Sequence, residues 1–241
     1  MTHATLPILS VVIPVQNEEK NITNAINGIK NNISIPYEIL VIYDTDDDST
    51  VPVVKKLSRN NTKIKYFKNM YSPGIINAVK TGFKKSLGEY VAVMSPDLAD
   101  NPSTLQVMYN KMQEGYDIVS ATRYSKGGKR IGQLSFKSFL SYIAGLGTPI
   151  LLGIPLTDLT NGFKMYRKRV VMSIKLQSTG GWEFTMELII KARERNFLMT
   201  EVPTVSQKRK YGHSKFKLSQ WLPKYIFWYV YGIKNRMRLL M

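Results

Sequence analysis

The sequence predicts an α/β fold, a mostly parallel sheet flanked by helices. Through the first half of the chain, short apolar runs alternate with segments whose apolar residues recur every three or four positions. Such alternation is typical of strand–helix repeats around a parallel sheet. The runs are apolar throughout, as expected of strands covered on both faces. With 241 residues and 44% hydrophobic content, the chain is long enough to bury a full core.

The first two strands and helices follow directly from this pattern. Residues 9–14 form an apolar run that ends at a proline, and residues 38–43 form a second run. Residues 16–20 lead into a helix between them, whose expected inner stripe is Ile22, Ala25, Ile26 and Ile29. A second helix is expected over residues 51–60, after the second strand.

The remaining repeats continue the alternation. Residues 64–67 predict a short third strand, and Pro73-Gly74 starts a helix. The inner stripe of that helix is Ile75, Ile76, Val79 and Phe83. Residues 90–94 predict a buried fourth strand, which a helix over 103–114 and a fifth strand over 117–121 follow.

Two carboxylates follow the fourth predicted strand, at the edge where open α/β sheets bind ligands. Asp97 and Asp100 are spaced so that together they would hold a divalent cation against a diphosphate. An alternative is that Asp100 caps the following helix beside Pro102.

Two further loops have a composition suited to ligands. The acidic loop 44–48 follows the second strand, and its four aspartates would serve a nucleotide base, a ribose or a metal. A plain solvated loop is the alternative. Gly127-Gly128 lies between Arg123 and Lys129, and this composition favours a flexible basic loop that a phosphate can approach. The alternative is an ordinary turn.

The net charge of +17 is concentrated in two segments without acidic residues, 118–157 and 202–241. Each segment also contains a long apolar run, 139–156 and 221–233. Cations beside apolar stretches favour an anionic membrane surface or a phosphorylated lipid as partner. A solvated basic face is an alternative, and basic stripes with aromatic residues also bind nucleic acids.

Sequence features that are absent restrict the cellular location that we expect for the protein. The chain has no cysteine, which excludes disulfides and thiolate–metal sites. Its first residues lack the basic and apolar regions of a signal peptide, and no apolar run reaches the roughly 18–20 residues of a spanning helix. We therefore expect a peripheral protein on the cytoplasmic face of a membrane.

Several segments follow one another in a recognisable order. They are residues 9–19, 44–50, 74–88, 90–102, 120–128, 158–164, 183–187, 201–203 and 209–215. In this order they resemble family 2 glycosyltransferases with the GT-A fold, in the branch of dolichyl- and polyprenyl-phosphate mannose synthases. The resemblance covers nearly the whole chain.

The resemblance implies roles for individual residues. Asp97, with Asp100 as helper, corresponds to the acids that bind Mg²⁺ or Mn²⁺. The residues that would bind the nucleotide sugar are Pro14, Gln16, Glu18, Asp44, Asp46, Ser95, Asp97 and Lys215. Those that would bind the acceptor phosphate are Arg123, Lys137, Arg209 and Ser214. The expected catalytic residues are Asp97, Arg123, Asp158 and Arg209.

The chain also departs from the family's pattern. Gln16 replaces the usual aromatic residue, Tyr43 the first acid of an Asp-Asp pair, and His213 a usual glutamate. Ser95 stands where the first metal-binding aspartate would be. We expect weaker metal binding, with Asp100 as the nearest substitute, and the donor stays open between GDP-mannose and UDP-glucose.

The implied reaction is an inverting transfer of mannose or glucose to a polyprenyl or dolichyl phosphate. The phosphate of such an acceptor is ionised near neutral pH, so no strong general base is needed. Transfer to a saccharide or glycolipid hydroxyl is an alternative that would use Asp158 as base. A catalytically silent protein that binds sugar nucleotides or lipids is another, motivated by Ser95. No nucleic-acid partner is expected, because that function leaves the acidic loop unexplained.

The expected catalytic domain covers residues 1–217, with a nucleotide-sugar half, 1–122, and an acceptor half, 123–217. Residues 139–155 predict an interfacial helix with a glycine-proline break, the alternative being an ordinary buried helix. Residues 218–241 predict a tail of aromatic residues and cations that lies among lipid headgroups. A second copy of the chain, or a membrane protein, stays open as a partner.

Overall fold

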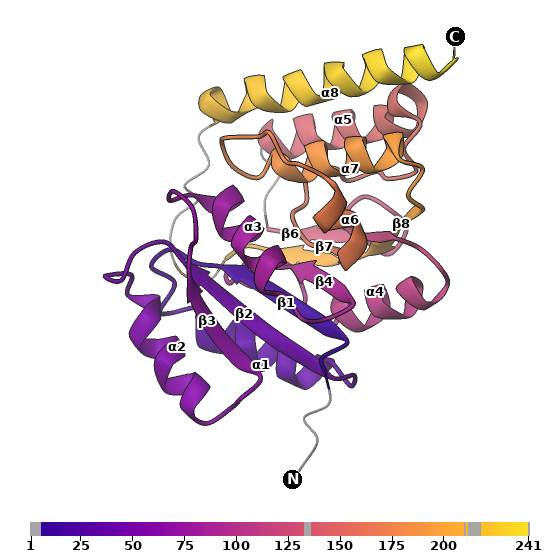
Figure 1. Cartoon of the computed structure of the whole chain (residues 1–241). Helices are drawn as coiled ribbons and strands as arrows, with labels where there is room; N and C mark the ends of the chain where they lie inside the picture. Colours follow the sequence, from indigo (N-terminus) through magenta and orange to yellow (C-terminus); the bar gives the residue numbers. More distant parts are fainter. Residues whose placement is uncertain (1–5, 133–135, 210, 212–217, 241) are drawn as a thin grey trace.

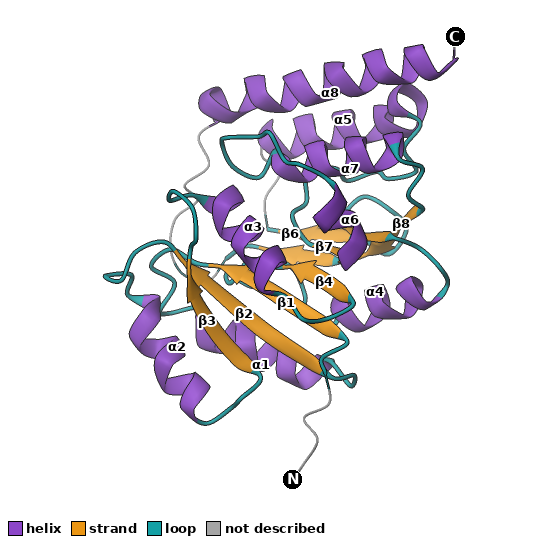
Figure 2. Ribbon diagram, in the orientation of Figure 1, coloured by secondary structure: helices purple, strands orange, loops and turns teal. Residues whose placement is uncertain are grey.

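The structure is a computed structural model that describes residues 6–132, 136–209, 211 and 218–240. Within these ranges only the backbone is described at 136–138, 140, 218–219 and 239–240. A central twisted sheet has helices on both faces, and three helices, α5, α7 and α8, are stacked on the side of the sheet that α6 covers (Figures 1 and 2).

The sheet has seven strands in the order β3-β2-β1-β4-β7-β5-β8. They are β1 Leu9–Pro14, β2 Tyr37–Tyr43, β3 Ile64–Lys68, β4 Tyr90–Val93, β5 Ile118–Thr122, β7 Lys164–Arg167 and β8 Met199–Pro203. Neighbours are parallel except at β7, which runs antiparallel between β4 and β5. Lys129–Ile131 (β6) and Val205–Gln207 (β9) pair separately. The predicted mostly parallel sheet and its five expected strands are confirmed.

Both faces of the sheet are buried, which explains the uninterrupted apolar runs. The helices α1 Ile22–Asn32, α2 Thr50–Arg59 and α4 Thr104–Gln113 pack with one core cluster, and α3 Ile75–Lys85 and α6 Lys168–Ser173 with the other. Along β1, Val11 and Ile13 belong to the first cluster and Val12 to the second. The predicted stripe of α1 is buried in full.

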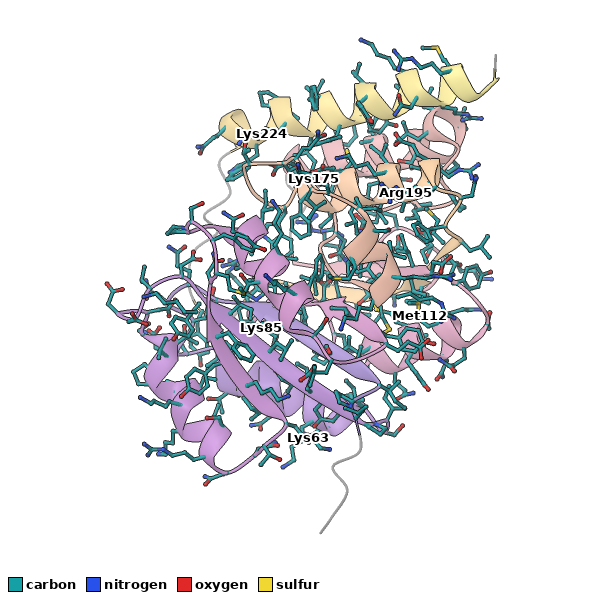
Figure 3. The ribbon with its side chains drawn as sticks, in the orientation of Figure 1. Lys63, Lys85, Met112, Lys175, Arg195 and Lys224 are labelled. Carbon is teal, nitrogen blue, oxygen red and sulfur yellow. The ribbon has the colours of Figure 1, made fainter. Side chains whose placement is uncertain are left out.

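The third layer consists of α5 Phe136–Leu152, α7 Phe184–Glu194 and α8 Leu218–Leu240. The helix α8 lies across α5 and α7 (Figure 1), and Figure 3 shows Lys224 near its beginning. The Trp228 side chain is buried, and its Nε1 donates to Ser178 Oγ at 2.9 Å. Tyr229 Oη donates to the Ala144 carbonyl of α5 at 3.0 Å. These contacts fix α8 to the rest of the fold, while the functional division at residues 122 and 217 stays a prediction.

The helices α5 and α8 expose many apolar side chains. The large ones are Phe139, Tyr142, Ile143, Leu146, Ile150, Leu151, Ile226, Phe227, Val230 and Met237. The alternative that residues 139–155 form an ordinary buried helix is therefore wrong. The helix includes Pro149 and ends before Gly153, whose φ of 64° few other residues adopt. In the part of the chain that the structure describes, no helix is both long and apolar enough to cross a bilayer.

Candidate active site

The strand directions bring most of the predicted site residues to one edge of the sheet. The strands β1, β2, β4 and β5 run in the same sense, so their carboxyl ends share that edge. The antiparallel β7 brings its amino end there as well. The segments 15–18, 44–48, 95–100, 123–128 and 158–163, which lie far apart in the sequence, adjoin this edge.

A cavity of about 770 Å³ opens at the middle of the edge. One end is polar and is lined by Ser95, Asp97, Asp100, Arg123, Arg130, Asn161 and Arg209. The other end runs between the third-layer helices and is lined by Ile143, Ala144, Gly147, Leu151, Met186, Leu222, Tyr225, Ile226, Tyr229 and Val230. The cavity therefore joins a charged site at the sheet to an apolar passage between α5 and α8.

Arg123 and Asp158 form a two-point ion pair beside the cavity. Arg123 Nε lies 2.7 Å from Asp158 Oδ2 and Nη2 lies 2.8 Å from Oδ1, with a further bond from Nη2 to Thr160 Oγ1. Burial would raise the pKa of Asp158, but the charge and hydrogen bonds of Arg123 outweigh it and leave that pKa lowered. The pair positions the guanidinium of Arg123 at the cavity wall, while the Asp158 side chain is fully buried behind it.

The two predicted metal-binding acids both line the cavity. Asp97 is buried, and its Oδ2 lies 2.8 Å from Arg209 Nη2 while Oδ1 accepts from the Ala99 amide. Asp100 accepts from Asn161 Nδ2 at 3.3 Å, and burial raises its pKa to about 6. Residue Ser103, not Asp100, precedes the first turn of α4, so the helix-cap alternative for Asp100 is wrong.

The donor set around Asp97 fits a cation of the Mg²⁺ or Mn²⁺ type. Asp97, Asp100 and Ser95 bring hard oxygen donors to the cavity lining. Among the described residues no group of three His, Cys, Asp or Glu side chains gathers. Two carboxylates suffice for Mg²⁺, which usually takes its other ligands from water and substrate phosphates. Asp97 and Asp100 would hold the ion.

The predicted nucleotide residues before Ser95 lie along the same edge but outside the cavity lining. Asp44 accepts from the Gly74 amide at 2.9 Å and from Asn69 at 2.8 Å, and Glu18 accepts from Asn21 at 2.6 Å. Asp46 is mostly exposed and pairs with Lys68. Pro14 ends β1, and Gln16 is exposed beyond it. Local partners thus offset the charges of the acidic loop, and the nucleotide roles stay predictions.

The structure does not describe the side chains of three predicted site residues, Lys137, Ser214 and Lys215. Ser214 and Lys215 lie outside the described residues, as does His213. The backbone of Lys137 belongs to α5, and its side chain is outside the described part. The Gly127-Gly128 pair forms a turn, with the Gly128 amide donating to the Ser125 carbonyl at 2.8 Å. That turn leads into β6, which brings Arg130 to the cavity.

Sequence reasoning missed Arg130, Asn161, Lys164 and Trp182. Asn161 and Lys164 sit in the segment 158–164, whose density of polar residues before an apolar strand was the available signal. Gly162 in that segment packs against Trp182, where a Cβ would lie 2.3 Å from the ring. Arg130 and Trp182 reach the cavity only through tertiary packing.

Comparison with known proteins places this geometry among carbohydrate-transferring enzymes. A profile described as Glycosyl transferase family 2 matches residues 10–175. The chain is 30% identical over 214 residues to a dolichol-phosphate mannosyltransferase of Pyrococcus furiosus, which covers 87% of this chain and 59% of that protein. It is 26% identical over 227 residues to a polyprenol monophosphomannose synthase of Mycolicibacterium smegmatis, with 88% and 85% covered.

A solved structure resembles the fold. Glucosyl-3-phosphoglycerate synthase from Mycobacterium tuberculosis, in complex with Mn²⁺, UDP and glucosyl-3-phosphoglycerate, matches with a TM-score of 0.68 at 16% identity. The match covers 96% of this chain and 81% of that one. At this identity the likeness bears on the fold alone, and the chain spans only 59% of the length of the Pyrococcus relative.

Proposed function

Because the chain belongs to glycosyl transferase family 2 and has the GT-A fold, we propose that it transfers a hexose from a nucleotide sugar to the phosphate of a polyprenyl lipid. The observation that carries the proposal is the two-ended cavity. Its polar end offers arginines and carboxylates to a diphosphate and a phosphate, and its apolar end between α5 and α8 suits a hydrocarbon chain. Relatives named for such lipids support the choice of acceptor.

The reaction would be a single displacement. An oxygen of the acceptor phosphate attacks the anomeric carbon, the bond from that carbon to the donor diphosphate breaks, and the nucleoside diphosphate leaves with the electron pair. The configuration at the anomeric carbon inverts. No proton has to be removed from the nucleophile.

The arginines would stabilise the charge that moves during this step. Arg123, held by Asp158, would bind and orient the acceptor phosphate, and Arg209 would bind phosphate oxygens near Asp97. A bound Mg²⁺ or Mn²⁺ would offset charge on the leaving diphosphate. Ser95 and Asp100 would complete the polar end around the donor.

The exposed apolar faces of α5 and α8 support action at a membrane surface. They flank the apolar end of the cavity, and α8 also has the cations Lys224, Lys234, Arg236 and Arg238. A helix pair with this composition would lie among anionic headgroups, so that a lipid phosphate enters between the helices.

The test is transfer of labelled hexose from a panel of GDP- and UDP-sugars to a polyprenyl phosphate in liposomes, with and without Mg²⁺ or Mn²⁺. The expected result is lipid-extractable label from one donor, inverted at the anomeric carbon. A product that keeps the donor's anomeric configuration would overturn the mechanism. Nucleotide binding without any transfer would identify a silent binding protein.

A second candidate is transfer to a hydroxyl group. The cavity position of Asp100 and its pKa of about 6 favour it as the general base that such an acceptor requires. The ion pair with Arg123 makes Asp158, the base expected from the sequence, unsuited to this role. Nucleotide release that depends on added saccharide, without label in lipid, would support this candidate.

A further inference from the structure

Lys164 is a fully buried cation that takes no part in the proposed reaction. It begins β7, and its Nζ donates to the carbonyls of Asp158 and Leu159, each at 3.3 Å, and to that of Asn161. A buried ammonium is costly unless its donors are satisfied, and here backbone carbonyls of one short loop satisfy them.

That loop, residues 158–161, carries the groups that orient both sides of the polar end. Asp158 holds Arg123 in a two-point pair, Thr160 adds a third bond to the same guanidinium, and Asn161 donates to Asp100. Every one of these contacts depends on where the loop backbone lies. The three bonds from Lys164 hold this backbone, together with those from Thr185 Oγ1 to the Leu159 carbonyl and from Asn161 Nδ2 to the Ala121 carbonyl.

We propose that Lys164 is a positioning residue for the acceptor-phosphate site: its ammonium holds the 158–161 loop in the conformation that aims Arg123 and Asp100 into the cavity. Lys164 does not touch the substrates. It acts through Asp158 and Asn161, so its loss should loosen Arg123 while the sheet and its two cores remain. The inference rests on the proposed function only for the identity of the acceptor.

The pKa of Lys164 provides a second way to test its role. Burial lowers its pKa to about 8, against the opposing effect of the Asp158, Asp100 and Glu201 carboxylates, while Arg123 lowers it further. Between pH 7 and 9 Asp158 stays ionised, Asp100 is above its pKa of about 6, and Arg123 stays protonated. Lys164 loses its charge in this window, so the loop should loosen as pH rises through about 8.

A matched pair of variants separates positioning from folding. Lys164→Met removes the three loop bonds. Lys168→Met removes a comparable lysine–carbonyl bond, from Nζ to Ser86 at 2.6 Å, at the opposite edge of the sheet. The first readout is the rate at which phenylglyoxal modifies Arg123, followed by peptide mass spectrometry, with Arg59 on α2 as internal reference. This readout needs no substrate, so it stands even if no lipid acceptor is found.

The expected result is a rise of about tenfold in the Arg123/Arg59 modification ratio for Lys164→Met and none for Lys168→Met. Binding of geranyl phosphate, measured by calorimetry, should weaken by a similar factor in Lys164→Met alone. A folded Lys164→Met protein with the wild-type ratio and the wild-type affinity would overturn the proposal. Absence of geranyl phosphate binding by the wild type, with the ratio changed as expected, would count against the proposed acceptor and not against the positioning role.

Should Lys164→Met not fold, the wild-type protein itself supplies the test. The Arg123/Arg59 ratio is expected to rise between pH 7 and 9, and in Lys164→Arg, which stays charged, to remain flat. A flat ratio in the wild type would contradict the proposal.

Discussion

The two halves of the polar edge handle charge in opposite ways. In the acidic loop after β2, Asp46 lies at the surface with Lys68, and Asp48 is satisfied by backbone and side-chain groups of Asn17 and Thr50. On the other side of the edge, Asp158, Lys164 and most of Arg123 are buried and compensate one another. Exposed pairs contribute little to stability, whereas buried charges are costly once a partner is lost. The side with Arg123 and Asp158 is therefore the part of the site most sensitive to the loss of a charged partner.

The largest expected effect comes from breaking the buried pair. Asp158→Ala should lower the free energy of unfolding by about 3 kcal/mol, because it leaves Arg123 buried without its carboxylate. Asp46→Ala, its matched control at the exposed pair, should change it by less than about 1 kcal/mol. Urea unfolding at pH 7 measures both. Equal losses of unfolding free energy in the two single variants would contradict the contrast between the halves. Recovery of the unfolding free energy in the double variant Asp158→Leu/Arg123→Met would support it.

The next largest expected effect is the dependence of the unfolding free energy on pH that Asp100 causes. Its folded pKa of about 6 lies above its ordinary value of 3.8, so the ionised form costs stability in the folded state. That cost is absent below pH 3.8 and develops as pH rises toward 6. Asp100→Asn should therefore raise the free energy of unfolding by about 2 kcal/mol at pH 8 and leave it nearly unchanged at pH 4. A gain of the same size at both pH values would rule out ionisation as its cause.

The contrast extends to the surface, where the large exposed apolar side chains of the described residues are most numerous on α5 and α8. Phe227→Glu on α8 should weaken binding to anionic vesicles about tenfold, because it removes an apolar contact and adds a repelled charge. Leu87→Glu, at a similarly exposed apolar residue just before β4, is the matched control. Co-sedimentation with vesicles that contain phosphatidylglycerol provides the measurement. Equal binding by both variants would argue against α8 as the membrane contact.

The smallest effect concerns the cation. Millimolar Mn²⁺ should raise the melting temperature of the wild type by a few degrees, since an ion that binds only the folded state stabilises it. Asp97→Asn should lose that increment, whereas Asp46→Ala should keep it. Scanning fluorimetry with chelator and with Mn²⁺ gives the comparison. An undiminished shift in Asp97→Asn would place the ion elsewhere.

The same division explains what could be predicted from the sequence. The strands β1 to β5, the stripe of α1 and the cavity position of Asp97 follow from local periodicity and from the rule that ligands bind at strand ends. The antiparallel strand β7 was not predicted because its first residue is a lysine, and lysines ordinarily lie at the protein surface. Its burial depends on carbonyls that only the folded loop provides.

Long-range contacts account for the rest of the site. Asn161 reaches Asp100 across 61 positions of sequence, and Asp158 reaches Arg123 across 35. Nothing in the local pattern around either residue encodes these pairings. The family resemblance identified both segments, but it did not indicate that Asp158 would be sequestered by an arginine.

The helix α8 supplies one wall of the cavity through Leu222, Tyr225, Ile226, Tyr229 and Val230, and these residues come after every other lining residue in the chain. On the ribosome, the edge of the sheet therefore takes shape before the passage for the acceptor has its second side. A nascent chain would be able to form its sheet edge early, whereas the proposed compartment for a lipid would close only when α8 docks through Trp228.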